Sequence, residues 1–157
     1  MKLWRIATET RTYPANNLSS AGAAKNSGRW NDDSQTVVYC APTLAMAVLE
    51  TAAHSTINGL PPNRFVVCID VPDAIWAKRR VVPASKLPAT RRAIPAGMTS
   101  VSLGSRWWLK NESAVLVVPS AIVPEESVCL LNSHHGDHAK ISIKVVRAFD
   151  FDVLFRV

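Results

Sequence analysis

Apolar residues along this chain follow two different periodicities, one typical of strands and one typical of a helix. Short runs rich in β-branched and aromatic residues, bounded by polar residues or proline, predict strands. Such runs occupy residues 3–7, 37–41, 64–71 and 113–118. Residues 140–146 alternate apolar and polar side chains, which is typical of a half-buried antiparallel strand. We expect a further edge strand over residues 151–157.

A helical pattern begins after Pro42. Thr43 is a candidate N-cap, because its hydroxyl can accept a hydrogen bond from an amide of the first turn. Six apolar residues then recur at helical spacing and predict one buried face: Leu44, Ala45, Val48, Leu49, Ala52 and Ala53. Glu50 lies at the margin of that face, one turn before His54. Strands outnumber helices without alternating with them, so the sequence predicts an α+β fold rather than a doubly wound parallel sheet.

Composition narrows the class of protein. The chain has 157 residues, of which 48% are hydrophobic and 19% charged, so we expect a single domain over residues 1–157 and exclude a disordered chain. No apolar run approaches the roughly 20 residues that span a bilayer. The three cysteines, Cys40, Cys68 and Cys129, are widely spaced in apolar surroundings, which favours reduced thiols in a cytoplasmic protein.

Positive charge is concentrated in one part of the sequence. The formal net charge is +6, and residues 74–111 carry eight basic residues and no acidic one. These are Lys78, Arg79, Arg80, Lys86, Arg91, Arg92, Arg106 and Lys110. A nucleic acid, an acidic protein partner, the pyrophosphate of a nucleotide or a solvated loop would each account for this segment.

Four polar residues lie at positions where a polar side chain either would be costly to bury or could contact a ligand. Arg29 follows a glycine in the polar stretch 8–36, and its guanidinium suits a phosphate or pyrophosphate, although it could simply pack over the adjacent tryptophan. Tyr39 lies within a predicted strand, where its ring either packs in the core or offers a flat face to a ligand. Glu50 needs a partner, such as Arg29 or Arg5, or else it stabilises a developing positive charge.

The fourth residue is Ser120, which follows Pro119 at the end of a predicted strand and is either a ligand contact or a turn residue. A hydrolase with Ser120 as nucleophile and His135 as base is an alternative, but the Gly-x-Ser-x-Gly elbow is absent. Residues 134–138 contain three histidines and an aspartate, yet they lack zinc-site spacing, so we favour a solvated turn or a substrate contact over a metal site.

Several short motifs occur in a distinctive order. They are Ser27-Gly28-Arg29-Trp30-Asn31, Val38-Tyr39, Leu49-Glu50, Val118-Pro119-Ser120-Ala121, and Leu131-Asn132 with His135. Together with residues 3–6 and 104–107, this order resembles the RES-domain family, toxins of bacterial toxin–antitoxin pairs that are named for an arginine, a glutamate and a serine. The chain departs from the family pattern at Val128 and Ser133.

The resemblance implies a compact fold similar to ADP-ribosyltransferases, with a mixed, mostly antiparallel β core and few helices. It implies NAD as the substrate, cleaved at the nicotinamide–ribose bond with water, phosphate or a protein as acceptor, and no further cofactor or metal. Glu50 would be the catalytic carboxylate, Arg29 the phosphate contact, Tyr39 a wall beside the nicotinamide, and Ser120 a group that holds the substrate or Glu50. Trp30, Asn132 and His135 would complete the substrate site.

The resemblance also implies a partner, an Xre-type antitoxin with a helix-turn-helix domain that blocks the active site and binds the operator. DNA would then be contacted only through the antitoxin, and both a homodimer and a larger hetero-oligomer stay open. The alternative function is a basic, non-enzymatic nucleic-acid-binding protein. Cleavage of the nicotinamide–ribose bond needs only one glutamate. Nicotinamide is cationic in NAD and leaves as a neutral molecule, so no general acid is required, and a single carboxylate can stabilise the cation that develops on the sugar.

Overall fold

Two β-sheets form the framework of this protein, whose computed structural model describes residues 1–18, 28–54, 62–88 and 97–154. The first sheet has the order β1-β3-β7, with bounds Lys2–Thr8, Arg64–Asp70 and Ser142–Phe149. The second has the order β2-β6-β5-β4, with bounds Val37–Cys40, Ser127–Asn132, Val115–Pro119 and Arg80–Val81. Every strand pair is antiparallel except β4 with β5, so the predicted mixed, mostly antiparallel α+β fold is confirmed.

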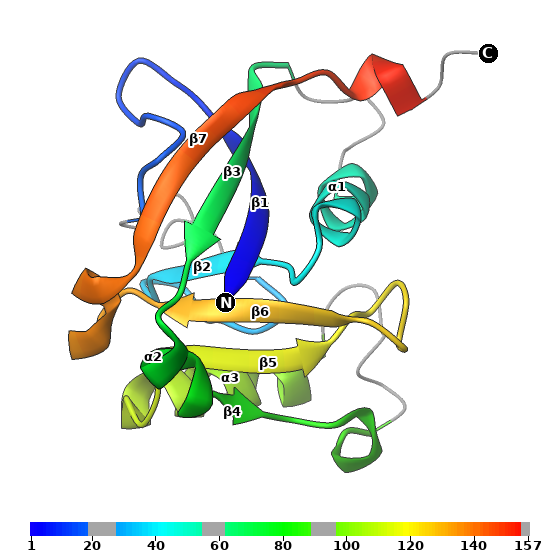
Figure 1. The fold of residues 1–157 in the computed structure, drawn as a ribbon. Coiled ribbons are helices and arrows are strands. Elements are labelled where there is room, and N and C mark those ends of the chain that lie inside the picture. The colour runs from blue at the N-terminus through cyan, green and yellow to red at the C-terminus, as the bar shows by residue number, and fades with distance from the viewer. Residues whose placement is uncertain (19–27, 55–61, 89–96, 155–157) are drawn as a thin grey trace.

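The two sheets cross at a steep angle and meet where β1 passes the end of β2 (Figure 1). Trp4 and Ala41 exchange two backbone hydrogen bonds of 2.8 Å at this junction. Apolar side chains of both sheets form one core cluster between them, which includes Leu3, Val67, Val38 and Leu131. The junction therefore places β1, which also pairs with β3, next to the end of β2, although these strands are far apart in the chain.

Helix α1 (Leu44–Ala53) packs beside the first sheet. The predicted N-cap is confirmed, because the Thr43 hydroxyl accepts a hydrogen bond of 3.2 Å from the amide of Met46. The predicted buried face is only partly right. Met46 and Ala47 are the buried residues of α1, whereas Ala45, Leu49 and Ala53 are exposed. The apolar residues cover more than half of the helix surface, so periodicity alone did not select the side that packs.

The other helices were not predicted. They are α2 (Asp73–Ala77), α3 (Met98–Lys110) and the 3-10 helices η2 (Ala84–Lys86), η4 (Gly136–Lys140) and η5 (Phe151–Leu154). The expected edge strand over 151–157 is wrong, since its first four residues form η5 and the last three lie outside the described residues. Phe151 is buried and packs edge to face on Phe149, which favours a turn over an extended edge.

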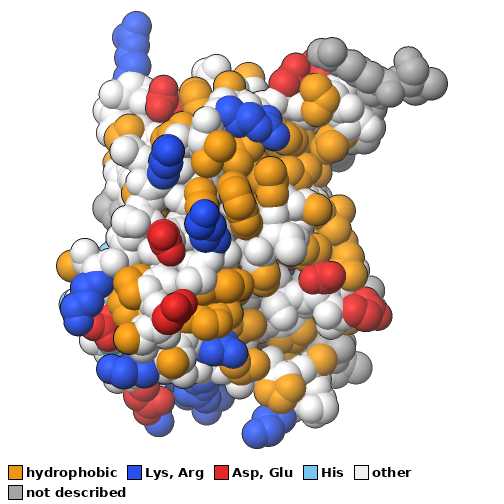
Figure 2. All heavy atoms as spheres, viewed as in Figure 1, with side chains coloured by type: hydrophobic (Ala, Val, Ile, Leu, Met, Phe, Trp, Pro, Cys, Tyr) orange, Lys and Arg blue, Asp and Glu red, His pale blue; other side chains and the backbone are white. Residues whose placement is uncertain are grey.

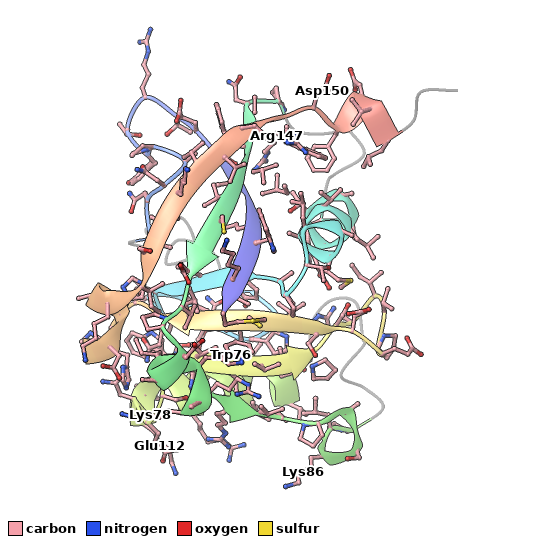
Figure 3. All side chains as sticks on the ribbon, in the orientation of Figure 1. Trp76, Lys78, Lys86, Glu112, Arg147 and Asp150 are labelled. Carbon is pink, nitrogen blue, oxygen red and sulfur yellow. The ribbon has the colours of Figure 1, made fainter. Side chains whose placement is uncertain are left out.

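The described basic residues of segment 74–111 lie in or next to α2, β4, η2 and α3. Figure 2 shows a group of Lys and Arg side chains at the lower end of the molecule, interspersed with acidic ones. Figure 3 shows Lys78 and Lys86 at this end, with Glu112 close to Lys78. Glu112 forms ion pairs with Arg80 at 3.7 Å and Lys110 at 3.5 Å. Arg91 and Arg92 lie outside the described residues. Nucleic-acid binding by this segment stays a prediction.

The cysteines agree with the predicted reduced state. Cys40 and Cys129 are buried, Cys68 is half-buried, and all three are free thiols. In the parts of the chain that the structure describes, no helix is long and apolar enough to cross a membrane.

Candidate active site

A cleft of about 580 Å³ opens where β1, β3 and α1 face β2 and the turn around Arg29. This volume is in the range of small-molecule sites, which is about 300–1,000 Å³. Arg29, Tyr39 and Glu50 all line it, so the structure brings together three residues that the sequence singled out. Val128, one of the departures from the family pattern, also lines the cleft.

Glu50 projects into the cleft from α1, and its carboxylate is held from the second sheet. The Ser120 hydroxyl, which follows β5, donates a hydrogen bond of 2.6 Å to Glu50 Oε1. The same hydroxyl oxygen accepts hydrogen bonds of 3.0 Å from the amides of Ile122 and Val123. Because these amides occupy the oxygen's lone pairs, the hydroxyl proton is directed at Glu50. Ser120 thus fixes the position of a carboxylate that is 19% exposed.

The second oxygen of Glu50 lies on the open side of the cleft. Its Oε2 is 3.9 Å from Nε2 of His54, one turn further along α1. The His54 side chain is 75% exposed and lines the cleft. His54 therefore forms part of the rim, whereas Ser120 is buried behind the carboxylate.

Arg29 stands at the tip of a tight turn. The Gly28 amide donates to the Asn31 carbonyl at 3.1 Å, which leaves Arg29 and Trp30 as the two central residues. The Trp30 indole is buried in a core cluster between the second sheet and α3. Trp30 is not among the residues that line the cleft, so its side chain anchors the turn while Arg29 faces the cleft.

Tyr39 contacts this turn through its hydroxyl group. Its Oη accepts a hydrogen bond of 3.0 Å from the Trp30 amide and donates one of 2.7 Å to Asn31 Oδ1. Burial raises the pKa of Tyr39 to about 12, against the smaller opposing effects of the hydrogen bond from Trp30 and of the Arg29 charge. The hydroxyl therefore stays protonated at neutral pH and keeps its donor.

Two further arginines line the cleft, and sequence reasoning assigned neither of them to the substrate site. Arg5 lies on β1 and Arg64 begins β3. Burial lowers the pKa of both guanidinium groups, and the charge of Arg64 also lowers that of Arg5. Arg64 donates to the Thr8 hydroxyl, whereas its buried Nε has no hydrogen-bond partner among the described residues. A positive charge inside a predicted strand is the signal that could have identified Arg5.

The cleft is consequently rich in positive charge. Arg5, Arg29 and Arg64 line it together with one carboxylate, Glu50. None of the described basic residues of segment 74–111 lines it. Guanidinium groups in a partly desolvated cleft attract phosphate, because charge-assisted hydrogen bonds are strengthened where water is excluded.

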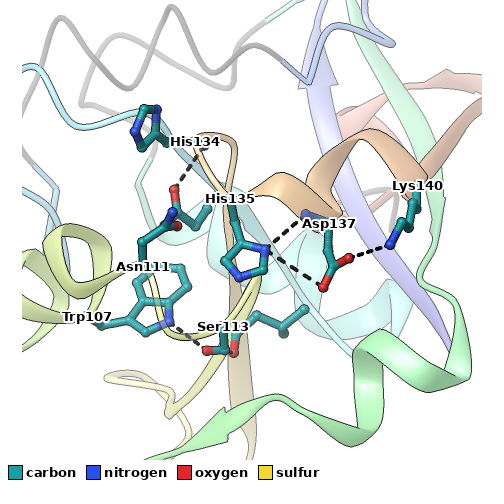
Figure 4. A network of polar contacts seen from close by, with 9 residues as sticks. Trp107, Asn111, Ser113, His134, His135, Asp137 and Lys140 are labelled. Atoms are coloured by element: carbon teal, nitrogen blue, oxygen red, sulfur yellow. Dashed lines mark hydrogen bonds and ion pairs between the residues drawn. The ribbon is translucent and has the colours of Figure 1, made fainter.

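Asn132 and His135 lie elsewhere. Asn132 ends β6, four residues and roughly 13 Å along the strand from Val128. Its side-chain nitrogen donates a hydrogen bond of 3.0 Å to Asn111 Oδ1, and its Oδ1 accepts one of 3.0 Å from the His134 amide. Figure 4 shows Asn111 and His134 near His135, with dashed lines that join His135 to Asp137 and Asp137 to Lys140. His135 Nδ1 accepts a hydrogen bond from the Asp137 amide and lines a separate cavity of about 140 Å³. The structure therefore does not place either residue with Glu50.

The turn that holds these histidines is built by local contacts. Lys140 Nζ lies 2.7 Å from Asp137 Oδ1, and its hydrogen bond holds the pKa of Asp137 below the usual range. Among the described residues, no group of three His, Cys, Asp or Glu side chains is arranged to hold a metal ion. The Ser120 hydroxyl donates to Glu50, which lines the first cleft, whereas His135 lines the separate cavity, so the two residues do not form the nucleophile–base pair of the hydrolase alternative.

A family model of the RES domain matches residues 2–153 of this chain. The chain belongs to the RES-domain family. The family resemblance seen in the sequence is thereby confirmed, and RES-domain relatives match over nearly the full length. "Prs ADP-ribosylating toxin" of Sphingobium sp. (strain YBL2) is 46% identical over 149 residues, covering 95% of this chain and 92% of the relative.

Other relatives carry the name "Toxin Res". That of Photorhabdus laumondii is 31% identical and covers 98% of this chain and 94% of its own. That of Yersinia enterocolitica is 30% identical and covers 86% of each. A solved structure, the M. tuberculosis MbcT–MbcA toxin–antitoxin complex, contains a chain with the same fold. The TM-score is 0.63 at 17% identity, covering 91% of this chain and 80% of that one.

Proposed function

We propose that this protein is a toxin that cleaves the nicotinamide–ribose bond of NAD in the cleft between β1, β2, β3 and α1. The observation that carries the proposal is the 2.6 Å hydrogen bond from Ser120 to Glu50 at a cleft lined by three arginines. The cleft combines a carboxylate in a fixed position with guanidinium groups that can bind phosphate. That combination is what transfer of ADP-ribose from a dinucleotide requires.

The chemistry follows from the charges that change. The bond between ribose C1′ and the nicotinamide nitrogen breaks, its electron pair stays on nitrogen, and the pyridinium becomes neutral. Positive charge develops on the ribose, as in glycoside cleavage. Glu50 stabilises that charge electrostatically, while arginine contacts to the phosphates hold the ribose beside the carboxylate. The acceptor then bonds to C1′ and releases its proton.

The relative from Sphingobium supports a protein as the acceptor, because its name describes ADP-ribosylation of Prs. We therefore propose ADP-ribosyl transfer as the reaction, with water and phosphate as the other acceptors to be tested. These acceptors leave different products, namely ADP-ribosylated protein, ADP-ribose and ADP-ribose 1″-phosphate.

We also propose an antitoxin partner that covers the cleft in the cytoplasm. The structural likeness to a chain of a toxin–antitoxin complex and the relatives named "Toxin Res" support this partner. The Xre-type, helix-turn-helix character of the antitoxin is an expectation from the family resemblance. Co-purification with the protein of an adjacent gene would identify it.

Incubation of the purified protein with NAD tests the function. We expect release of nicotinamide, measured by chromatography, and a loss of about 100-fold or more in Glu50→Gln. Glu125→Gln is a matched control, because Glu125 is exposed beyond β5 and does not line the cleft. Parallel reactions with Prs, with phosphate and with neither would identify the acceptor. No nicotinamide in any of them would reject the proposal.

A further inference from the structure

The turn that carries Arg29 is held by residues from two other parts of the chain. Tyr39 of β2 binds it on one side, through the Trp30 amide and the Asn31 side chain. Gly104 of α3 contacts it on another, because a Cβ atom at Gly104 would lie only 1.8 Å from the Trp30 carbonyl oxygen. The turn therefore rests directly on the backbone of α3.

Gly28, the first residue of the turn, makes room for the contact between Tyr39 and Asn31. A Cβ atom there would lie 2.6 Å from both Asn31 Oδ1 and the Tyr39 hydroxyl oxygen. Any larger residue would push the tyrosine hydroxyl away from the turn. The absence of a side chain at Gly28 thus lets the Tyr39 hydroxyl reach Asn31 at 2.7 Å.

The Tyr39 hydroxyl has a single proton to donate, and it donates that proton to another residue of the protein. It donates to Asn31 and accepts from Trp30, so one acceptor site is all that it could offer to a substrate. Without this hydroxyl, the Trp30 amide and Asn31 Oδ1 would both lose a partner. The turn would then have more freedom to move, and Arg29 with it.

We propose that Tyr39 supports substrate binding through Arg29: its hydroxyl holds the Gly28–Asn31 turn in the place from which the Arg29 guanidinium reaches the phosphates of the dinucleotide. This inference rests on the proposed function and makes Tyr39 a positioning residue. It differs from the role as a nicotinamide wall that the family resemblance implies, because the aromatic ring by itself would not suffice.

A double-mutant cycle tests the inference, with ADP-ribose binding measured by calorimetry. ADP-ribose retains the pyrophosphate and lacks nicotinamide, so contacts to the pyridine ring do not contribute. We expect Tyr39→Phe to weaken binding about tenfold, which is the effect of one lost hydrogen bond. Arg29→Gln should weaken it more, by about 100-fold. The double variant should bind as weakly as Arg29→Gln alone, because Tyr39 acts through Arg29.

Each other outcome overturns the inference. Unchanged binding by Tyr39→Phe would mean that the ring is what matters. Additive losses in the double variant would mean that Tyr39 contacts the ligand independently. Absence of ADP-ribose binding by the unsubstituted protein would also overturn it. Release of nicotinamide from NAD by the same preparation decides the proposed function separately.

The kinetic constants with NAD distinguish a positioning role of Tyr39 from a purely structural one. Contacts to the phosphates act in both ground and transition states, so Tyr39→Phe should raise KM about tenfold and leave kcat within about twofold. A fall in kcat at constant KM would contradict the inference. Tyr13→Phe is the matched control, since Tyr13 is 38% exposed and does not line the cleft. Asn31→Ala removes the acceptor of Tyr39 and should reproduce the effect on KM.

Discussion

Ser120 and Glu50 are 70 residues apart in the chain, and the Ser120 hydroxyl donates a 2.6 Å hydrogen bond to Glu50 Oε1. The hydroxyl is itself oriented by the amides of Ile122 and Val123. This relationship joins α1, which packs on the first sheet, to the end of β5 in the second. The carboxylate is therefore fixed only when both sheets are in place.

Ser120→Ala should lower both activity and stability. The carboxylate loses its anchor, and two amides lose their acceptor, which costs about 1–3 kcal/mol of unfolding free energy. We expect nicotinamide release to fall about tenfold, the effect of one lost hydrogen bond. Ser113→Ala is the control, because the buried Ser113 hydroxyl likewise both accepts and donates, from the Trp107 indole and to the Val115 carbonyl. Urea unfolding should show similar losses, and equal losses of activity would argue against a role for Ser120 at the carboxylate.

Gly104→Ala should disturb the turn that carries Arg29 from outside the cleft. Its Cβ would overlap the Trp30 carbonyl oxygen, and overpacking of this kind costs about 1–3 kcal/mol. Affinity for ADP-ribose should fall at least about tenfold. Gly136→Ala is the control, since nothing lies within 4 Å of a Cβ there. A Gly104→Ala protein with native stability and affinity would mean that α3 does not hold the turn.

Stability should decline at alkaline pH. Burial raises the pKa of Cys40 well above its ordinary value, and raises the pKa of Cys129 to about 12. Above pH 9 the unfolded chain loses these protons while the folded protein retains them, so unfolding becomes easier by about 1.4 kcal/mol per pH unit for each group. Urea midpoints measured under reducing conditions should therefore fall from pH 9 upward.

Tyr39 adds to this decline between pH 10 and about 12, the interval between its ordinary and its raised pKa. Tyr39→Phe should thus flatten the curve only above pH 10. Midpoints that stay constant from pH 8 to 11 would contradict the assignment of buried, neutral thiols and a buried phenol.

Arg5→Gln should stabilise the free protein and weaken NAD binding. Arg5 is half-buried, burial and the charge of Arg64 lower its pKa, and its side chain makes no ion pair with a described residue. Removing this charge should raise Tm by about 2–4 °C, equivalent to about 1 kcal/mol for a domain of this size. KM for NAD should rise about tenfold. Arg147→Gln is the control: Arg147 lies on the exposed part of β7 (Figure 3), so neither Tm nor KM should change. A lower Tm for Arg5→Gln would mean that Arg5 stabilises the fold.

Helix α3 shows why part of the fold escaped prediction. Its buried face consists of Ser100, Gly104 and Trp107, spaced four and three residues apart. Two of the three are small residues that no hydrophobic pattern reveals, and Gly104 is there because the Trp30 backbone touches it. The apolar residues Met98 and Leu109 of α3 are exposed instead. The residues on the buried face of α3 thus match the shape of the elements packed against it, and they do not follow a hydrophobic helical periodicity.

The chain alone predicted β1, β2, β3, β5, β7 and the start of α1, because strand patterns and the Thr43 cap depend on residues a few positions apart. It did not predict β4 or β6. Arg29, Tyr39, Glu50 and Ser120 were found by the residue types in their motifs. Only the tertiary structure joined Ser120 to Glu50, brought Arg5 and Arg64 into the same cleft, and left Asn132 and His135 outside it. These relationships depend on the order of strands in two sheets and on how the sheets cross. Contacts between residues so far apart in the chain leave no local pattern in its sequence.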